Sequence, residues 1–333
     1  MIQSLDGMSI LVTGATGSFG RSFVRTLTRQ HAPARIAVFS RDEAKQYEMQ
    51  QDPELRDDRR IRYFIGDVRD AERLELAMRE VDLVVHAAAL KQVPTAEYNP
   101  FECIHTNVFG AENVVRAAIR NRVQRVLALS TDKAANPINL YGASKLASDK
   151  IFIAANNLSG RVGTRFSVVR YGNVIGSRGS VIPFFRQLIA RGTDHLPITD
   201  PRMTRFWLTL QQGVDFVVRC VREMQGGEIF VPKIPSMKVI DVARAIAPSL
   251  PLKTIGIRPG EKLHEVMITE DDSRYTYDMG DRFVIEPAFA LWSRDRVAPA
   301  SAKLVAPEFC YSSETNDQWL TNQQLLSILD TGS

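Results

Sequence analysis

Short hydrophobic runs alternate with amphipathic stretches through the first half of the chain. Strand-like runs occupy Ser9–Thr13, Arg35–Ser40, Ile61–Ile65, Leu83–Ala87, Arg125–Ser130 and Arg165–Val169. Between them, apolar residues recur at helical spacing, for instance in Phe19–Leu27, Glu72–Arg79 and Phe101–Ile119. Such alternation is typical of βαβ units with parallel strands. The pattern therefore predicts an α/β fold with a doubly wound parallel sheet.

The pattern changes after Tyr171. Glycine and proline punctuate the next thirty or so residues, at Gly172, Gly176, Gly179, Pro183, Gly192, Pro197 and Pro201. Helical periodicity returns in Gln211–Met224 and Val239–Ile246. We therefore expect a nucleotide-binding domain over residues 1–170, with a return to it at about 206–230. Residues 171–205 and 231–333 are expected to form a smaller mixed α/β substrate-binding region.

Composition and charge exclude several classes of protein. With 333 residues, 44% of them hydrophobic, the chain can bury one large core or two unequal domains. The net charge of +4 is small and its basic residues are scattered, so no nucleic-acid partner is indicated. No apolar run has the length of a signal-peptide core or a bilayer span. A cytoplasmic protein without a membrane segment is expected.

The cysteines and histidines show no metal-binding pattern. Cys103, Cys220 and Cys310 are isolated, without CxxC or Cys/His spacing. This argues against a disulfide framework and against a structural zinc site. We expect no metal, and the three thiols fit a reducing compartment.

The first motif with chemical meaning is a glycine-rich turn over Thr13–Gly20. It follows a predicted strand and opens a predicted helix, with Ser18 and Phe19 inside the turn. Gly14 permits a tight turn, Gly17 allows the backbone to approach a pyrophosphate, and Gly20 allows close helix–strand packing. The motif predicts a Rossmann-like dinucleotide site, although a glycine trio can also be a plain turn.

The end of the second strand should select the cofactor. In NAD-binding proteins, an acidic residue there holds the ribose 2′-hydroxyl. Here Ser40 and Arg41 precede Asp42, and Lys45 lies one helical turn further on. These groups can neutralise a 2′-phosphate, which favours NADP. Two alternatives stay open: Arg41 could be solvated, and Asp42 could hold ribose or cap the next helix.

Two further segments end predicted strands at the edge where ligands collect in doubly wound sheets. They are Asp67-Val68 and Ala87-Ala88. We expect them to contact the adenine and the nicotinamide ribose of the cofactor. Asp67 could instead cap a helix, and the alanines could simply allow tight packing.

Tyr141 and Lys145 form the expected catalytic pair. They are four residues apart, so on a helix they share a face. A phenol with an ordinary pKa near 10 is a poor base at neutral pH, but a nearby ammonium and an oxidised nicotinamide both favour the phenolate. Tyr141 can then take a hydroxyl proton as hydride leaves carbon. The Ser-Thr-Asp segment that precedes the pair at a strand end supports this interpretation.

Over nearly its whole length the chain resembles the extended short-chain dehydrogenase/reductase family of nucleotide-sugar enzymes. The motifs that carry the finer resemblance are Ser130–Pro137, Arg170–Val174, Pro197–Asp200 and Arg258–Lys262. They are similar to those of inverting UDP-N-acetylglucosamine 4,6-dehydratases, which open pseudaminic acid biosynthesis. The resemblance implies UDP-N-acetylglucosamine as substrate, a role in polysaccharide biosynthesis or flagellin glycosylation, and a homo-oligomer, dimer or hexamer.

The resemblance also implies a reaction. Carbon 4 is oxidised, water is lost across carbons 5 and 6, and hydride returns to carbon 6. The product would be UDP-2-acetamido-2,6-dideoxy-β-L-arabino-hex-4-ulose. Tyr141 with Lys145 would gate the hydride, Lys133 would be the base near carbon 5, and Asp132 the acid near carbon 6. Thr131 would bond the 4-hydroxyl group.

Lys133 is the residue from which the configuration of carbon 5 in the product is predicted. In the similar retaining dehydratases, a glutamate follows the aspartate, so a lysine there implies a different base and inversion of carbon 5. Lys133 must be neutral to accept a proton, and we expect the charges of Lys145 and nicotinamide to lower its pKa. The same charges oppose protonation of Asp132. A local Asp132–Lys133 ion pair in a loop is the alternative interpretation.

The less regular second region is expected to hold the substrate. The candidates are Lys91, Thr131, Asn173, Arg178, Thr199, Arg205, Arg258 and Glu261. Arginines suit bidentate binding of a diphosphate. By resemblance, the stretch that ends at Thr199 would pair with uracil, and Glu261 would orient Arg258 or hold ribose. Lys91 is expected to contact cofactor or substrate.

Two other functions fit the same motifs less well. A UDP-sugar 4-epimerase would use Tyr141 and Lys145 but would have no use for Asp132 and Lys133. A non-enzymatic NADP-sensing regulator could share the fold, because fold does not fix function.

Overall fold

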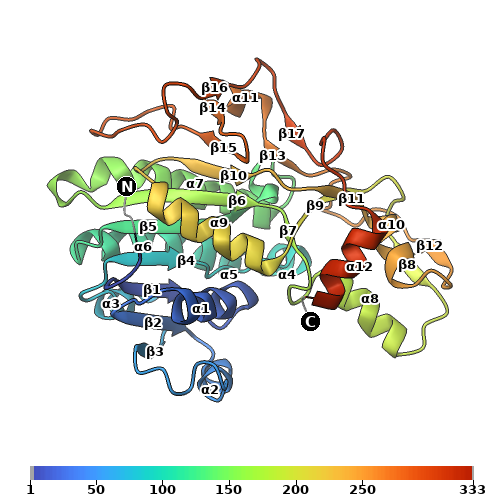
Figure 1. Ribbon diagram of the computed structural model, residues 1–333, viewed down its shortest axis with the longest axis horizontal. Coiled ribbons are helices and arrows are strands. Elements are labelled where there is room, and N and C mark those ends of the chain that lie inside the picture. The colour runs from blue at the N-terminus through green and yellow to red at the C-terminus, as the bar shows by residue number, and fades with distance from the viewer. Residues whose placement is uncertain (1–3, 332–333) are drawn as a thin grey trace.

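A ten-stranded sheet forms the centre of the computed structural model, which describes residues 4–331 (Figure 1). Seven strands are parallel, in the order β3 (Ile61–Ile65), β2 (Arg35–Ser40), β1 (Ser9–Thr13), β4 (Leu83–His86), β5 (Arg125–Thr131), β6 (Arg165–Tyr171) and β10 (Ile229–Pro232). This confirms the predicted doubly wound sheet. All six predicted strands begin where expected, while β4 ends one residue earlier and β5 and β6 continue further.

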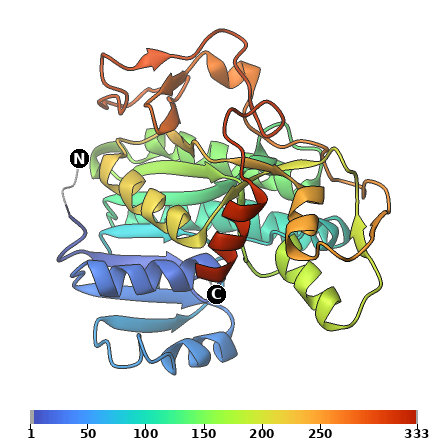
Figure 2. The same cartoon turned by 45° about the vertical axis from the view of Figure 1, so that its right-hand side comes forward.

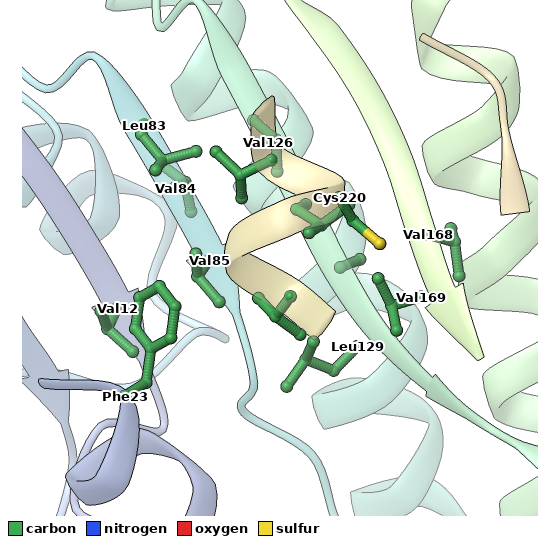
Figure 3. Packing of buried hydrophobic residues seen from close by; sticks show 14 of the residues in the cluster. Val12, Phe23, Leu83, Val84, Val85, Val126, Leu129, Val168, Val169 and Cys220 are labelled. Carbon is green, nitrogen blue, oxygen red and sulfur yellow. The ribbon is translucent and has the colours of Figure 1, made fainter. Parts of the chain in front are cut away.

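Helices cover both faces of this sheet. The helices α1 (Ser18–Gln30) and α9 (Leu210–Glu223) pack together on one face, and α3 (Ala71–Ala77), α6 (Gly110–Arg120) and α7 (Leu140–Leu158) lie on the other (Figures 1 and 2). Figure 3 shows Cys220 of α9 over Val126 of β5 and Val168 of β6. These side chains are fully buried, because parallel strands covered on both faces present apolar residues in both directions.

The predicted helix over Phe101–Ile119 is wrong as a single element. After α4 (Val93–Tyr98), the chain forms α5 (Pro100–Ile104), then a π-helical turn η1 over His105–Phe109, and then α6. The buried side chain of Asn107 lies inside the π turn and bonds neighbouring segments. One extra residue in a helical turn leaves no signal in the hydrophobic periodicity, and such π turns are frequent at functional sites.

The segment expected to return to the sheet does so through α9 and β10. The chain then adds an antiparallel edge, β15 (Arg282–Ile285), β14 (Thr276–Asp278) and β16 (Lys303–Leu304), beside β10. Residues 276–304 therefore extend the large sheet, although the sequence pattern placed them in the substrate-binding region. The division into two domains stays a prediction.

The remaining elements form a smaller lobe beside the carboxyl ends of the parallel strands (Figure 1). It contains the strand group β7 (Asn173–Val174), β9 (Thr204–Leu208) and β11 (Ser236–Lys238), and the pair β8 (Leu196–Ile198) and β12 (Leu252–Thr254). Its helices are α8 (Val181–Ala190), α10 (Val239–Ile246) and α12 (Asn322–Thr331). Trp207 and Ile182 belong to a core cluster of this lobe, separate from that of the sheet.

Several further short elements complete the secondary structure of the described residues. They are α2 (Glu43–Gln50), the 3₁₀ turns η2 (Asp132–Ala134) and η3 (Gly160–Val162), β13 (Val266–Ile268) paired with β17 (Tyr311–Ser312), and α11 (Glu270–Ser273). Among residues 4–331, no helix combines the length and apolar character needed to cross a membrane.

Candidate active site

One large cleft contains nearly all the predicted site residues. Its volume is about 1190 Å³, and it lies between the carboxyl ends of the parallel strands and the smaller lobe. Sites for one small molecule usually occupy about 300–1,000 Å³, so this cleft has room for two ligands side by side. Every residue that the sequence assigned to catalysis, cofactor or substrate lines it, with the exception of Asp132.

The glycine-rich turn lines the cleft at the amino end of α1 with backbone atoms. Gly14 has φ +65°, and a Cβ there would lie 2.8 Å from the backbone of Ala88. A Cβ on Gly20 would lie 2.4 Å from Cα of Ala15. Side chains are therefore excluded where a pyrophosphate would approach the helix amino terminus, and the residues fit a dinucleotide.

At the end of β2, Asp42 caps α2. Its Oδ1 accepts a hydrogen bond from the Lys45 backbone N–H at 3.0 Å, and its Oδ2 lies 2.5 Å from Lys45 Nζ. These bonds from Lys45 lower the pKa of Asp42. Of the two roles considered for Asp42, capping is therefore the one present in the ligand-free protein.

Two arginines lie near this end of the cleft. Arg41 lies 3.8 Å from Asp67, whose other contact is Arg69 at 2.7 Å. Arg178, expected beside the substrate diphosphate, instead approaches the glycine-rich turn, where its backbone N–H lies 3.4 Å from Ser18 Oγ. Its charge also contributes to the lowered pKa of Asp42, so Arg178 is on the cofactor side of the cleft.

The helix α7, which carries Tyr141 and Lys145, is fixed at its first turn. Asn139 Oδ1 accepts from the Gly142 N–H at 2.7 Å, and Asn139 Nδ2 donates to Gly260 O at 2.8 Å. A Cβ on Gly142 would lie only 2.3 Å from the carbonyl oxygen of Lys133. Glycine at this position lets α7 contact η2, which brings Tyr141 beside Lys133. The sequence interpretation missed both residues, although an asparagine just before a helix is a recognisable cap.

A cluster of charges surrounds the amine of Lys133. Its Nζ lies 3.0 Å from Asp132 Oδ1 and 3.1 Å from Glu265 Oε1, and Glu265 lies 3.7 Å from Arg205 Nε. Thr131 donates to Asp132 Oδ1 at 2.9 Å. Both carboxylates are buried, with Asp132 0% and Glu265 2% exposed. The predicted neighbour Asp132 is thus present, and Glu265 is a second one that the sequence did not reveal.

The expectation of a lowered pKa for Lys133 is wrong for the ligand-free protein. Burial alone would lower the pKa, but the charges of Asp132 and Glu265 outweigh it and raise the pKa above its ordinary value. The expectation failed because it considered cations only. Glu265 is distant in sequence and joins the cluster through tertiary structure alone.

Tyr141 and Lys145 are both buried on α7. Burial raises the pKa of Tyr141 to about 12, against the opposing effects of the Lys133 charge and a hydrogen bond with the Thr131 side chain. Burial lowers the pKa of Lys145, and the charge of Asp149 opposes this shift. Without ligands, Tyr141 is therefore a neutral phenol at neutral pH.

Behind Lys145 lies a buried polar network that the sequence interpretation did not include. Asp149 Oδ2 accepts from Ser130 Oγ at 2.8 Å and lies 3.6 Å from Arg170. Arg170 also donates to Met267 O at 2.9 Å. The network joins β5, α7, β6 and β13, so it holds the catalytic helix to the segment that carries Glu265.

Asn107 of the π turn η1 holds the segment after β4 against α7. Its side chain exchanges hydrogen bonds with the backbone of Leu90 at 2.8 and 2.9 Å and donates to Ser144 Oγ at 2.9 Å. Ala87, Ala88 and Lys91 in and beside this segment line the cleft. No spacing rule in the sequence singled out Asn107.

Five of the predicted substrate residues line the cleft from the side of the smaller lobe, namely Asn173, Thr199, Arg205, Arg258 and Glu261, whereas Lys91 follows β4 and Thr131 ends β5. Arg205 is nearly buried and donates to the backbone oxygens of Thr204, Leu263 and Lys262 at 2.7, 3.1 and 2.9 Å. Arg258 is exposed and pairs with Glu261. Arg205 thus holds the segment before Glu265, while Arg258 remains accessible from the cleft.

Asn173 and Thr199 lie on the same side of the cleft. Thr199 Oγ1 donates to Met203 Sδ at 3.2 Å. Within the described part of the chain, no three His, Cys, Asp or Glu side chains are grouped as a metal site would require.

Fold and site together define an extended short-chain dehydrogenase/reductase. More specifically, the chain belongs to the family described as polysaccharide biosynthesis protein, whose pattern matches residues 10–287. An inverting UDP-N-acetylglucosamine 4,6-dehydratase of Campylobacter jejuni (serotype O:23/36, strain 81-176) is 54% identical over 98% of each chain. A UDP-glucose 4-epimerase of Rickettsia bellii (strain OSU 85-389) is 42% identical over 83% of this chain and 82% of its own.

Solved structures give the same classification. Pen from Bacillus thuringiensis superposes with a TM-score of 0.89 and 34% identity, over 98% of each chain. DesIV is a dTDP-glucose 4,6-dehydratase from Streptomyces venezuelae that was solved with NAD bound. It has a TM-score of 0.67 and 25% identity over 77% of this chain and 87% of its own. The resemblance found in the sequence motifs is confirmed.

Proposed function

We propose that this protein is a UDP-N-acetylglucosamine 4,6-dehydratase that inverts carbon 5. The observation that carries the proposal is the position of Lys133. It lines the cleft, and its backbone carbonyl packs against Gly142 of α7, the helix that carries Tyr141. A 4-epimerase does not eliminate water, so it would not need the buried cluster of Asp132, Lys133 and Glu265 beside Tyr141. The 54% identity to an inverting dehydratase supports the same substrate.

The cofactor would bind along the glycine-rich turn. When bound, it takes a hydride from carbon 4 of the sugar and later supplies one to carbon 6. Tyr141 accepts the proton of the 4-hydroxyl group. The pKa of Tyr141 is about 12 in the empty cleft, where Lys145 is already present, so the phenolate would form when the oxidised nicotinamide adds its positive charge. Proton removal is thereby tied to an occupied cofactor site.

The next step removes the proton on carbon 5, which the new ketone makes acidic. Lys133 is the proposed base, and it must first pass its own proton to one of its carboxylate neighbours. Asp132 and Glu265, whose carboxylate oxygens lie 3.0 and 3.1 Å from Nζ, are the two groups that can receive it. Water leaves from carbon 6, and a later proton delivered to the opposite face of carbon 5 inverts that centre.

NADP is the proposed cofactor. The solved relative DesIV holds NAD, so the choice rests on residues of this chain. Arg41 is more than half exposed, and Lys45 lies with it at the end of β2, where a 2′-phosphate would approach. Arg178 adds a third cation on the same side of the cleft. This positive charge favours the extra phosphate of NADP.

The deciding experiment is proton NMR of UDP-N-acetylglucosamine incubated with the purified protein in deuterated water. A new 6-methyl signal, deuterium on carbon 5 and L-arabino geometry are expected. If the hydroxymethyl group survives and only carbon 4 changes, the epimerase is the correct function, as the 42% identity to a UDP-glucose 4-epimerase would allow. Cofactor binding without any turnover of the sugar would support a regulator instead.

The biological setting follows from this reaction. The product would enter pseudaminic acid biosynthesis and flagellin or cell-surface glycosylation, in the cytoplasm. We also propose a homo-oligomer, dimer or hexamer. Large apolar side chains on α4 and α5 support it, since Tyr98 is 87% and Phe101 77% exposed. Light scattering on the eluting protein would give the assembly size, and a monomer at micromolar concentration would contradict it.

A further inference from the structure

Two carboxyl groups contact Lys133, but they face different surroundings. Asp132 is completely buried and does not line the cleft. Its Oδ1 is occupied by both Thr131 and Lys133. Glu265 also contacts Lys133, yet it does line the cleft. An acid that protonates a leaving group must reach that group, and Glu265 meets this condition in the ligand-free protein.

Glu265 also has an oxygen available for a proton. Its Oε2 is buried and has no hydrogen-bond partner among the described residues, while Oε1 faces Lys133. The second oxygen of Asp132 lacks a partner as well, but it is enclosed in the protein interior. A buried carboxyl oxygen without a partner is costly, which favours protonation or contact with a ligand hydroxyl group.

The backbone at Glu265 is held firmly in place. Its N–H donates to Ser313 Oγ at 2.9 Å, and its carbonyl accepts from the Ser313 N–H at 2.8 Å. Arg205 fixes the preceding residues through Leu263 O. The side chain of Glu265 pairs with Lys133 and Arg205, and its anchored backbone holds it at the cleft, as a proton-transfer group requires.

We propose that Glu265 is the catalytic acid that protonates the departing hydroxyl group of carbon 6, after accepting the Nζ proton of Lys133. This inference deepens the proposed function and depends on it. Asp132 is then a positioning residue, whose anionic oxygen keeps Lys133 in place beside Glu265.

The proton balance of this step closes. Transfer from Lys133 to Glu265 leaves a free amine and a neutral carboxylic acid. The amine takes the proton from carbon 5, the electron pair forms the double bond between carbons 5 and 6, and the breaking carbon 6–oxygen bond takes the proton of Glu265, which releases water. The ammonium–carboxylate pair of the ligand-free protein is thereby restored. The proton that carbon 5 gains later is balanced by the one that Tyr141 removes at carbon 4.

A change of leaving group tests the role directly. In UDP-2-acetamido-2,6-dideoxy-6-fluoro-glucose, fluoride can leave without being protonated first. We expect E265Q to lose about 10²–10⁴-fold in dehydration of UDP-N-acetylglucosamine. Fluoride release from the fluoro analogue should stay within about tenfold of the wild-type rate. In E265Q, Asp132 at 3.0 Å can still take the Nζ proton of Lys133, so the free amine can accept the carbon 5 proton. Reduction of the bound cofactor, followed by absorbance, should be unchanged in E265Q.

D132N is the matched control. It removes the other carboxylate, and we expect it to slow both substrates alike because it disturbs the base. Equal losses on both substrates in E265Q would overturn the proposal, as would selective rescue by fluoride in D132N. If E265Q fails to fold, E265D provides the same comparison with a partial loss. A wild-type protein that changes only carbon 4 would refute the dehydratase itself, independently of Glu265.

Discussion

At the scale of single residues, the behaviour of Lys133 depends on its neighbours more than on its place in the motif. The sequence motif singled out Lys133 and Asp132, and in the structure Lys133 lines the cleft while Asp132 is buried beside it. The motif could not identify Glu265, because that contact joins residues far apart in the chain. The sign of the pKa shift of Lys133 therefore could not be obtained from sequence, since two buried anions decide it.

Removing the amine should separate the two halves of the reaction. We expect K133M to lose about 10²–10⁴-fold in formation of the 6-methyl product. Oxidation at carbon 4 should continue, because Tyr141 and Lys145 are intact. Absorbance of the reduced cofactor and NMR of the product measure the two halves. The control K150M changes an exposed lysine on α7 and should have no effect. Loss of cofactor reduction in K133M would contradict the assigned role.

Asp149 should set the pH at which Lys145 loses its proton. Its charge raises the pKa of Lys145, against the effect of burial. In D149N this support is gone, so the pKa of Lys145 falls further. Because the phenolate of Tyr141 needs the ammonium, activity is lost as pH rises through the pKa of Lys145. We expect this loss to move to lower pH in D149N, measured as the pH profile of cofactor reduction. A uniform decrease with an unmoved profile would indicate a structural role only.

At the scale of elements, hydrophobic pattern predicts the buried parallel strands well, because each is covered on both faces and reads as a short apolar run. It predicts the site less completely. The glycine-rich turn and the Tyr141–Lys145 pair have fixed spacing and were found. Asn107 depends on a π turn, which leaves no periodic signal. The antiparallel edge from β14 to β16 was missed because its strands are short and follow a loop-rich region.

The contact between α7 and η2 depends on a missing side chain. We expect G142A to lose about 1–3 kcal/mol of unfolding free energy, because its Cβ would overlap the carbonyl of Lys133. It should also lose activity, since Tyr141 moves relative to Lys133. Thermal unfolding and product formation measure the two effects.

G213A in α9 is the matched control. Its Cβ would meet Leu208 at 3.4 Å, an ordinary contact, and alanine favours a helix interior over glycine. We expect no loss, or a gain of up to about 1 kcal/mol. Equal destabilisation by both substitutions would mean that the contact with Lys133 has no special importance.

At the scale of the whole molecule, the cleft joins the sheet to the smaller lobe, so ligands should stabilise the entire fold. At 100 times its dissociation constant, a ligand adds about 2.7 kcal/mol to the free energy of unfolding. We expect NADP to raise the melting temperature more than NAD at equal concentration. R41A should reduce this difference, whereas R116A, an exposed position on α6 outside the cleft, should not. Equal shifts by the two cofactors in the wild-type protein would contradict the NADP preference.

The pairing of Lys133 with Glu265 also has an evolutionary consequence. A single change of Lys133 to glutamate would reproduce the motif of the retaining enzymes, but it would leave three carboxylates crowded together, without the Lys133 amine and with Arg205 beside Glu265 only. Such an intermediate would be destabilised and inactive. A lineage could therefore exchange one stereochemical outcome for the other only through a coordinated change at position 265, which makes the handedness of the product a trait that single mutations rarely reverse.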